Sequence, residues 1–381
     1  MADTTVVKPD LSFIRELKAA GGDTLKQCYQ CATCSVVCPQ SPDNKPFPRK
    51  EMIWAGWGLK DKLVSDPDIW LCHHCGDCTS YCPRGAKPGE VMGAIRKQAI
   101  QHYAPVPFLA KAVNNKDSLL TVLAIPVVIL AVLAAITPAL NRILPESLMH
   151  EGAFGNFINT WLVDATFISA ALFAIWSAYK GITNMWASMK ANSANAPTGN
   201  LMGSIIAVVT EILSHSKFKE CDVNKDRATA HMLTLYAFIG LFITTNIGFI
   251  IMYFTGEEGV LGRMLWMMMK FIGNVSAVVL IAGAWLLYLN RKAKDEKSGL
   301  GTYFDWGFLV MVLLVGVTGF LAQILRMLGG VHSTDPNILA KAVYFIHLVT
   351  VFYLFAYAPY SKFAHIFYRT TALVFAKMSS R

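Results

Sequence analysis

The residues from Cys28 to Pro39 read CYQCATCSVVCP, and those from Cys72 to Pro83 read CHHCGDCTSYCP. Each stretch holds four cysteines with the spacing C-x2-C-x2-C-x3-C-P. Three thiolates at two-residue intervals can turn inward together around one cubane, whereas the fourth, after a longer step, reaches a neighbouring cluster. The spacing therefore predicts two [4Fe–4S] clusters in the N-terminal part of the chain.

The expected ligand sets are crossed between the two stretches. One cluster is assigned to Cys28, Cys31, Cys34 and Cys82. The other is assigned to Cys72, Cys75, Cys78 and Cys38. Four-cysteine zinc sites are the alternative, but they usually combine pairs of cysteines rather than two quartets that each end in proline. Cys221 stands apart, and we expect it to be a free thiol.

The composition points to a membrane protein with a soluble part. Of 381 residues, 54% are hydrophobic and only 15% are charged, whereas soluble domains have about 25% charged residues. The net charge of +9 is spread over the segments between apolar stretches, so we expect no nucleic-acid partner. Residues 1–10 hold no apolar export signal, and clustered cysteines in a reducing compartment indicate metal ligands rather than disulfides.

Six apolar stretches follow the cysteine-rich part, each near the roughly 20 residues that a helix needs to cross a bilayer. They are Leu119–Thr137, Trp161–Tyr179, His231–Phe254, Met264–Leu289, Trp306–Leu325 and Ala342–Ser361. Pro126 and Pro359 are expected to kink the first and the last of these helices. Two shorter helices are also predicted, at Arg49–Gly56 and, lying on the inner membrane surface, at Leu201–Leu213.

These patterns predict an all-α protein with two domains. Residues 1–110 form a helical ferredoxin-type head with two clusters, and residues 111–381 form a six-helix transmembrane cytochrome b bundle. If the head is cytosolic, the inner segments hold 14 Lys and Arg residues and the outer segments hold four. This imbalance predicts a multi-pass protein of the inner membrane with both termini in the cytoplasm.

Histidines in the apolar stretches suggest haem. His347 and His365 are 18 residues apart, which on one helix places them on one face about 27 Å apart. That is the pattern of a two-haem bundle, in which each haem needs a second histidine at equal depth. His231 begins the third span at the inner side, where the sixth ends, so we predict that His231 and His365 are axial ligands of an inner haem b.

The partner of His347 stays open. A long helix holding both His215 and His231 would pair His231 with His347 and His215 with His365, and His150 and His332 are further candidates. With a single haem, His347 becomes a candidate for a quinone site. Asp164, near the outer end of the second span, is the other candidate, as a proton relay.

The cysteine motifs, the run LCHHCGDCTSYCPRGAKPG from Leu71 and the stretch from His215 to Cys221 resemble the membrane subunit of quinone-interacting membrane-bound oxidoreductase complexes. That family joins a heterodisulfide reductase C-like iron–sulfur part to an E-like cytochrome b part. The resemblance implies two haems b, menaquinone, and soluble flavin and iron–sulfur partner subunits. It also implies electron flow to the reductase for adenosine 5′-phosphosulfate in sulfate respiration.

Three functions are compatible with these features. The first is a quinone-linked oxidoreductase subunit that passes electrons from menaquinol through haem and clusters to soluble flavoproteins. The second is a heterodisulfide or trisulfide reductase-type membrane subunit with another acceptor. The third is a passive membrane anchor of a redox complex, which a haem-free protein would favour. No G-x-G-x-x-G or P-loop motif is present, so we expect no bound nucleotide or flavin.

Overall fold

The structure is a computed structural model that describes residues 8–143, 154–193, 197–223, 225–256, 259–293, 301–328 and 337–380. Within these ranges the regular structure is entirely helical and contains no β-strand. The predicted all-α class is therefore confirmed. His150 and His332 lie outside the described residues.

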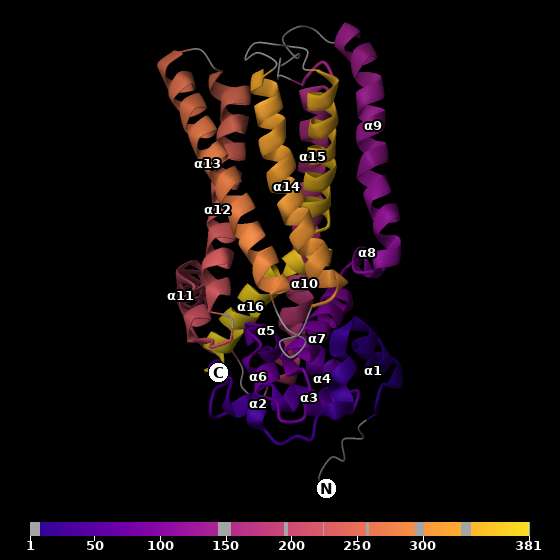
Figure 1. Ribbon diagram of the computed structural model, residues 1–381, viewed down its shortest axis with the longest axis vertical. Coiled ribbons are helices and arrows are strands. Elements are labelled where there is room, and N and C mark those ends of the chain that lie inside the picture. The colour runs from indigo at the N-terminus through magenta and orange to yellow at the C-terminus, as the bar shows by residue number, and fades with distance from the viewer. Residues whose placement is uncertain are drawn as a thin grey trace.

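Six helices in the described part of the chain are long and apolar enough to cross a membrane. They are α9 (Leu119–Ile143), α10 (Thr160–Asn192), α12 (Asp226–Ile250), α13 (Gly259–Lys292), α14 (Tyr303–Leu328) and α15 (Ile338–Ala356). They run roughly side by side, with α9 at one edge of the bundle (Figure 1). All six predicted spans are confirmed as helices, which indicates a multi-pass membrane protein.

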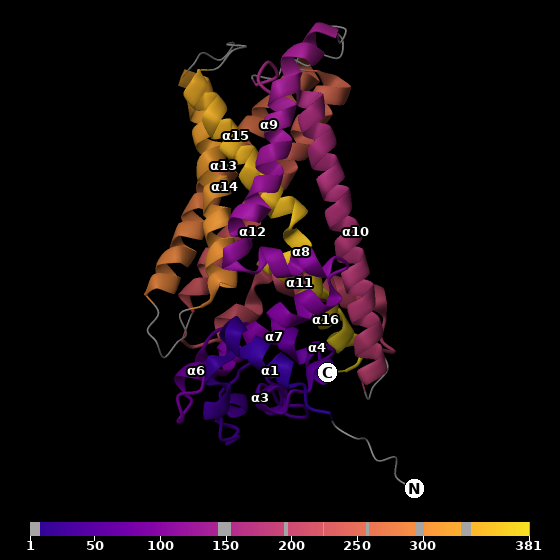
Figure 2. The ribbon, with the colours of Figure 1, turned by 90° about the vertical axis from the view of Figure 1, so that its right-hand side faces the viewer.

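The cysteine-rich part forms a compact head at one end of the bundle (Figures 1 and 2). Its helices are α1 (Leu11–Leu17), α2 (Thr33–Val36), α3 (Arg49–Gly56), α4 (Lys60–Val64), α5 (Asp68–Leu71), α6 (Asp77–Ser80), α7 (Pro88–Tyr103) and α8 (Pro107–Val113). The helix predicted at residues 49–56 is thus confirmed. The predicted division between residues 110 and 111 falls inside α8, which leads into α9.

Head and bundle share one hydrophobic core. Its members from the bundle side include Met185 and Met189 of α10 and Tyr368 of α16 (His365–Met378). The Tyr368 ring stacks on Trp70 of the head with ring centres 5.3 Å apart. Close packing of this kind resists relative movement, so α16, which lies between bundle and head (Figure 1), fixes the head against the membrane helices.

A glycine permits this close approach. A Cβ atom added at Gly181 of α10 would lie 2.2 Å from the Tyr368 hydroxyl oxygen, far inside van der Waals contact. Any side chain at residue 181 would have to displace the buried Tyr368 ring.

The last span is shorter than predicted. The helix that begins at Ile338 ends at Ala356, and 3₁₀ turns at Ala358–Tyr360 and Lys362–Ala364 follow before α16 begins at His365. Pro359 lacks a backbone N–H and disfavours helical conformation in the residue before it, which explains the break. His347 and His365 therefore do not share one helix, and the expectation of one common helix face was wrong.

The short helix predicted at Leu201–Leu213 is confirmed as α11 (Leu201–Ser214). The Asn200 side chain caps its first turn by accepting a hydrogen bond from the Gly203 N–H. Its buried Val208 packs with Val374 and Met378 of α16. The segment that follows α11 runs back toward the head, and it carries His215 and Cys221.

Candidate functional site: two cysteine loops and a histidine cavity

The two cysteine loops have the same backbone conformation. Gln30 and Ala32 have φ angles of 60° and 69°, and their counterparts in the second loop, His74 and Gly76, have φ angles of 53° and 97°. Residues in the left-handed conformation at equivalent positions turn the backbone of both loops in the same way. Each turn also directs a backbone N–H at the first thiol of its loop, at 3.4 Å from Gln30 to Cys28 and 3.3 Å from His74 to Cys72.

The fourth cysteine of each loop lies against the other loop. The neighbours that affect the Cys34 thiol are Cys28, Cys31 and Cys82. Those that affect Cys38 are Cys72 and Cys75, and those of Cys78 include Cys72, Cys75 and Cys38. Burial, reinforced by these neighbours, raises the pKa of both Cys34 and Cys38 to about 12. Thiols grouped and buried in this way suit thiolate ligation by a metal centre.

The two groups differ in exposure. Cys31 is exposed and Cys28 is half-buried in the first loop, whereas Cys72 and Cys78 of the second loop are buried. The first group faces the surface of the head. The second group faces the junction with the bundle, because its loop contacts α16 and the segment after α11.

Three arginines surround the second loop. The carbonyl oxygen of Cys72 accepts hydrogen bonds from Arg96 at 3.0 Å and from Arg369 of α16 at 3.1 Å. Arg227 of α12 donates to the carbonyl oxygen of His74 at 2.8 Å. Burial, followed by the charges of Arg369, Arg227 and Arg96, lowers the pKa of His73 to about 2. Positive charge and hydrogen bonds therefore concentrate around this loop.

His231 and His365 face one another at this junction, with ring centres 6.4 Å apart. Imidazole–metal bonds of about 2.0–2.1 Å give two axial imidazoles ring centres that are separated by about 6 Å. The His365 Nδ1–H donates to the Lys362 carbonyl oxygen at 2.7 Å, so its Nε2 carries the free lone pair. A hydrogen bond of this kind orients a ligand histidine.

His215 orients His231 in the same manner. The Leu213 carbonyl, 3.5 Å away, can only accept, so the His215 Nδ1 carries a proton and its Nε2 accepts from the His231 Nδ1 at 2.8 Å. The Nε2 of His231 is then the free nitrogen. His215 lies just beyond the end of α11 in a left-handed conformation (φ 52°), so no long helix joins it to His231. The pairing that depended on that helix was wrong.

His347 lies apart from the other histidines of the described chain, in the middle of α15. The Thr318 hydroxyl lies 3.1 Å from its Nδ1. A Cβ atom at Gly319 of α14 would lie 2.7 Å from the His347 Cε1, so the ring packs directly on the α14 backbone. No second histidine is at this depth in the described residues.

Asp164 is paired across the bundle. The Tyr253 hydroxyl donates a hydrogen bond to the Asp164 carboxylate. The Trp161 ring packs edge-on against Tyr253, with centres 5.1 Å apart. This carboxylate and phenol form a polar pair in the half of the bundle that lies away from the head.

A cavity of about 270 Å³ joins the histidines to the second cysteine loop. His73, His231, His365 and Arg291 are among its lining residues. Arg369 donates to the His73 Nε2 at 2.7 Å, and because arginine only donates, the proton of His73 is on Nδ1. That N–H and the Arg291 Nη1 are buried without a hydrogen-bond acceptor in the described structure, although the Asp305 carboxylate pairs with Arg291 at 3.8 Å.

Phe218 occupies the space between these groups. Its ring centre is 5.2 Å from that of His231 and 4.8 Å from that of His73. Sequence reasoning missed this contact, the arginine shell and the role of His215. The HSKFKEC run at residues 215–221 held the only local signal, because it placed aromatic, basic and thiol groups next to a histidine.

A second group of ligand-type side chains lies in the head. The carboxylates of Glu51, Asp66 and Asp68 are buried within 4.8 Å of one another. The Lys50 ammonium group lies among them, at 3.3, 2.5 and 2.7 Å respectively. This ammonium group already occupies the place that a metal ion would take.

Residues 24–86 match the family model described as a 4Fe-4S dicluster domain. The chain is similar to the C subunit of the H2:CoB–CoM heterodisulfide, ferredoxin reductase of Methanothermobacter marburgensis, with 40% identity over 27% of this chain and 54% of the relative. It is similar to a protein of Archaeoglobus profundus that is named as like the C subunit of heterodisulfide reductase, with 37% identity over 27% of this chain and 53% of that protein. The chain thus spans about half the length of these relatives.

A different relative matches along most of the chain. Citrate utilization protein B of Escherichia coli is 28% identical over 80% of this chain and 80% of its own length. No solved structure matches. The cysteine-rich head therefore contains a 4Fe-4S domain and is similar to heterodisulfide reductase C subunits.

Proposed function

We propose that this chain is a membrane electron-transfer subunit that oxidises menaquinol and passes electrons through haem b and two [4Fe–4S] clusters to soluble flavin and iron–sulfur partner subunits. One observation carries the proposal most strongly. The facing pair His231 and His365 and the second cysteine loop line the same cavity. A one-electron carrier between the two imidazoles would lie next to the loop that receives its electrons.

The clusters are assigned to the crossed ligand sets. Cys72, Cys75, Cys78 and Cys38 hold the inner cluster, next to the cavity. Cys28, Cys31, Cys34 and Cys82 hold the outer cluster. The neighbour relations of Cys34 and Cys38 support this assignment, since each fourth cysteine lies with the three of the opposite loop.

The residues around the cavity fit a bis-histidine haem. The ring centres of His231 and His365 are 6.4 Å apart, and in each ring a hydrogen bond at Nδ1 leaves Nε2 free to bind a metal. The His73 Nδ1–H and the Arg291 Nη1, which are buried without a hydrogen-bond acceptor in the described structure, suit the carboxylate groups that a haem carries. When bound, the haem supplies a one-electron carrier, and His231 and His365 would be its axial ligands.

The chain's own aromatic groups connect the two centres. Phe218 contacts both His231 and His73, and His73 lies between the first two cysteines of the second loop. We propose that electrons cross here to the inner cluster and leave through the exposed outer cluster to a soluble partner.

Quinol must reach the chain from lipid and release protons. Asp164 with Tyr253, and His347 with Thr318, are the polar groups proposed for its binding. Both pairs lie inside the bundle. Burying a polar side chain there costs free energy, so such residues usually serve a function. We propose that the chain lies in the inner membrane with its head and both termini in the cytoplasm, because Lys and Arg are concentrated in the segments on the side of the head.

The identity of the terminal electron acceptor is a separate part of the proposal. The resemblance of the motifs points to flavoprotein partners that lead to adenosine 5′-phosphosulfate reductase. Similarity over most of the chain to citrate utilization protein B and in the head to heterodisulfide reductase C subunits favours, as the second candidate, the same electron path with a different soluble partner.

The test is a reduced-minus-oxidised visible spectrum with a pyridine haemochrome assay on the purified chain. Variants His231→Ala, His365→Ala and His347→Ala are compared with the wild type. We expect a b-type spectrum that is lost in the first two variants and kept in the third. A wild-type chain that binds no haem would contradict the conduit and leave an iron–sulfur head on a passive anchor.

A further inference from the structure

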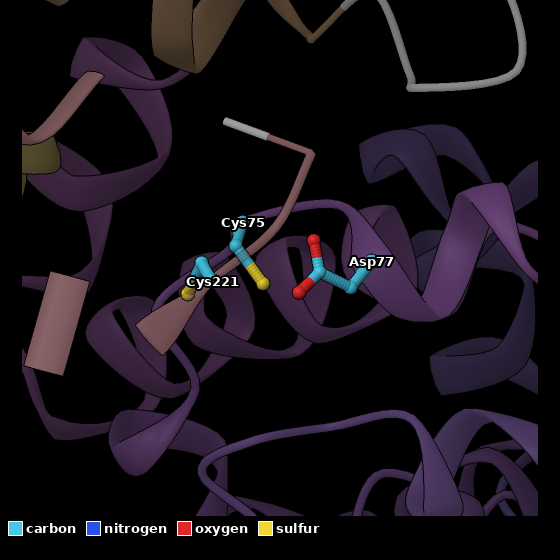
Figure 3. A group of neighbouring side chains, drawn as sticks. All are labelled: Cys75, Asp77 and Cys221. Atoms are coloured by element: carbon cyan, nitrogen blue, oxygen red, sulfur yellow. The ribbon is translucent and has the colours of Figure 1, made fainter. Parts of the chain in front are cut away.

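The ninth cysteine lies beside the second cysteine loop. Cys221 belongs to the segment between α11 and α12, and its side chain approaches Cys75 and Asp77 (Figure 3). The two sulfur atoms and a carboxylate oxygen of Asp77 lie within 4.8 Å of one another, and Cys75 and Cys221 share a side-chain hydrogen bond. Cys221 is only 1% exposed.

Several hydrogen bonds hold Cys221 in this position. The Asp77 carboxylate accepts from the backbone N–H of Asp222 at 3.0 Å and of Val223 at 2.9 Å. The Tyr81 hydroxyl donates to the Asp222 carboxylate at 3.2 Å. The membrane part is thus tied to the cluster loop on both sides of the Asp77 carboxylate.

A further contact comes from the first loop. The Gln40 amide donates to the Lys217 carbonyl oxygen at 3.3 Å and to the Glu220 carboxylate at 2.7 Å. Contacts on both sides place Cys221 at a fixed point relative to Cys75. The position of the thiol is therefore built by the fold rather than left to one contact.

We propose that the Cys221 thiol donates a hydrogen bond to the sulfur of Cys75 and so raises the reduction potential of the inner cluster. The proposal rests on the cluster assignment above, in which Cys75 is a ligand. A coordinated thiolate has no proton and can only accept, whereas an uncoordinated cysteine has an S–H group to donate. Hydrogen bonds to cluster sulfurs are among the factors that set the reduction potential.

The direction follows from charge. Reduction adds negative charge to the cluster, and part of it resides on the ligand sulfurs. A donor pointed at one of those sulfurs stabilises the reduced state more than the oxidised state. Cys221 is thus a positioning residue that acts through Cys75, and it lets the membrane part adjust the electron acceptor that lies next to it.

The test is a redox titration of the full-length holoprotein followed by EPR, on the wild type, Cys221→Ala and Cys221→Ser. We expect Cys221→Ala to shift the midpoint potential of the inner cluster to a more negative value and to leave the outer cluster unchanged. Cys221→Ser, which keeps a donor, should lie nearer the wild type. Val223→Ala, which keeps the backbone N–H bonded to Asp77, is the matched control and should change nothing.

Three outcomes would overturn the proposal. One is an unchanged inner-cluster potential in Cys221→Ala. Another is an equal shift of both clusters, which indicates a general structural change. The third is loss of iron from Cys221→Ala, which would make Cys221 a ligand. Failure of the proposed function is distinct, because it would appear in the wild-type chain itself, as absent haem or absent cluster signals.

Discussion

The two cysteine loops share spacing and backbone conformation but lie in different surroundings. The first loop has Tyr29 and Gln30 between its first two cysteines and faces solvent, and its carbonyl at Gln30 accepts from Arg49. The second loop has His73 and His74 there, and α16, α12 and the segment after α11 cover it. Local spacing therefore determines what a loop can bind, whereas packing determines its place in the electron path.

The largest expected effect is the loss of one cluster when the fourth cysteine of either loop is replaced. Cys38→Ser should remove the inner cluster, and Cys82→Ser should remove the outer one, because each thiol lies with the opposite loop. EPR spectra and iron content measure the loss. A water-soluble paramagnetic relaxing agent identifies the outer cluster by its exposure.

One result would contradict the crossed ligand sets. If Cys38→Ser altered only the solvent-exposed cluster, each loop would hold its own four ligands, and the crossed assignment would fail. Each cluster would then belong to a single loop, and Cys38 and Cys82 would exchange clusters.

Removing the arginine of α16 should affect only the second loop. Arg369→Gln loses hydrogen bonds to the Cys72 carbonyl and to His73. Losses of supporting groups around metal sites typically cost about 10- to 100-fold in activity or metal affinity. We expect a loss of that order in the rate of inner-cluster reduction, measured by freeze-quench EPR.

Lys377→Gln is the matched control for this variant, since it removes an exposed basic residue from the same helix. An equal slowing by both variants would show that only the net charge of α16 matters. The arginine shell would then have no specific role at the second loop.

The helix between the loops tests how they are held together. The Arg49 side chain donates to the first loop, and Lys50 binds Asp66 and Asp68, which lead into the second. Lys50→Met leaves the buried Asp66 and Asp68 carboxylates without their cation, and breaking a buried ion pair costs about 3–5 kcal/mol. Urea unfolding of the holoprotein, followed by cluster absorbance, should show destabilisation of that order.

Exposed Lys62 on the neighbouring helix gives the comparison variant, Lys62→Met, for which we expect less than about 1 kcal/mol. If Lys50→Met were equally mild, the acidic group would not support the second loop. The link from α3 to that loop would then lie elsewhere.

The prediction with the smallest change from one measurement to the next is a pH dependence of stability. Burial, opposed by Lys50 and reinforced by Asp66 and Asp68, raises the pKa of Glu51 to about 8. Its protonated form therefore stabilises the fold. That contribution is complete below the pKa in the unfolded chain, about 4.3, and declines by at most about 1.4 kcal/mol per pH unit until the pH passes 8.

Glu51→Gln should flatten this part of the stability curve, whereas Glu16→Gln, at an exposed residue of the head, should leave it unchanged. Urea unfolding at several pH values between 5 and 8 measures both slopes. Equal slopes in all three proteins would contradict the role of Glu51.

Much of this architecture was predictable from the sequence because its signals are local. Cluster spacing and span length depend on neighbouring residues, so the cysteine motifs and six helices were found. Matching depth also suggested His231 with His365, and the fold brings their ring centres to 6.4 Å from one another. Depth alone could not show the break at Pro359, because the helix end depends on the turns that follow it.

The missed contacts all join distant segments. His215 reaches His231 only because α11 ends in a left-handed turn. Cys221 reaches Cys75 because the Asp77 carboxylate accepts hydrogen bonds from the backbone N–H groups of the next two residues, Asp222 and Val223. No periodicity or spacing encodes such contacts, so they required the packed structure.

The central claim is an ordered path from quinol to haem, inner cluster and outer cluster. Rapid mixing of the membrane-reconstituted holoprotein with a menaquinol analogue, followed by haem absorbance and freeze-quench EPR, tests it directly when wild type and His365→Ala are compared. We predict that haem is reduced first, the inner cluster next and the outer cluster last, and that neither cluster is reduced by quinol in His365→Ala. Clusters reduced by quinol at the same rate in both proteins would contradict the account.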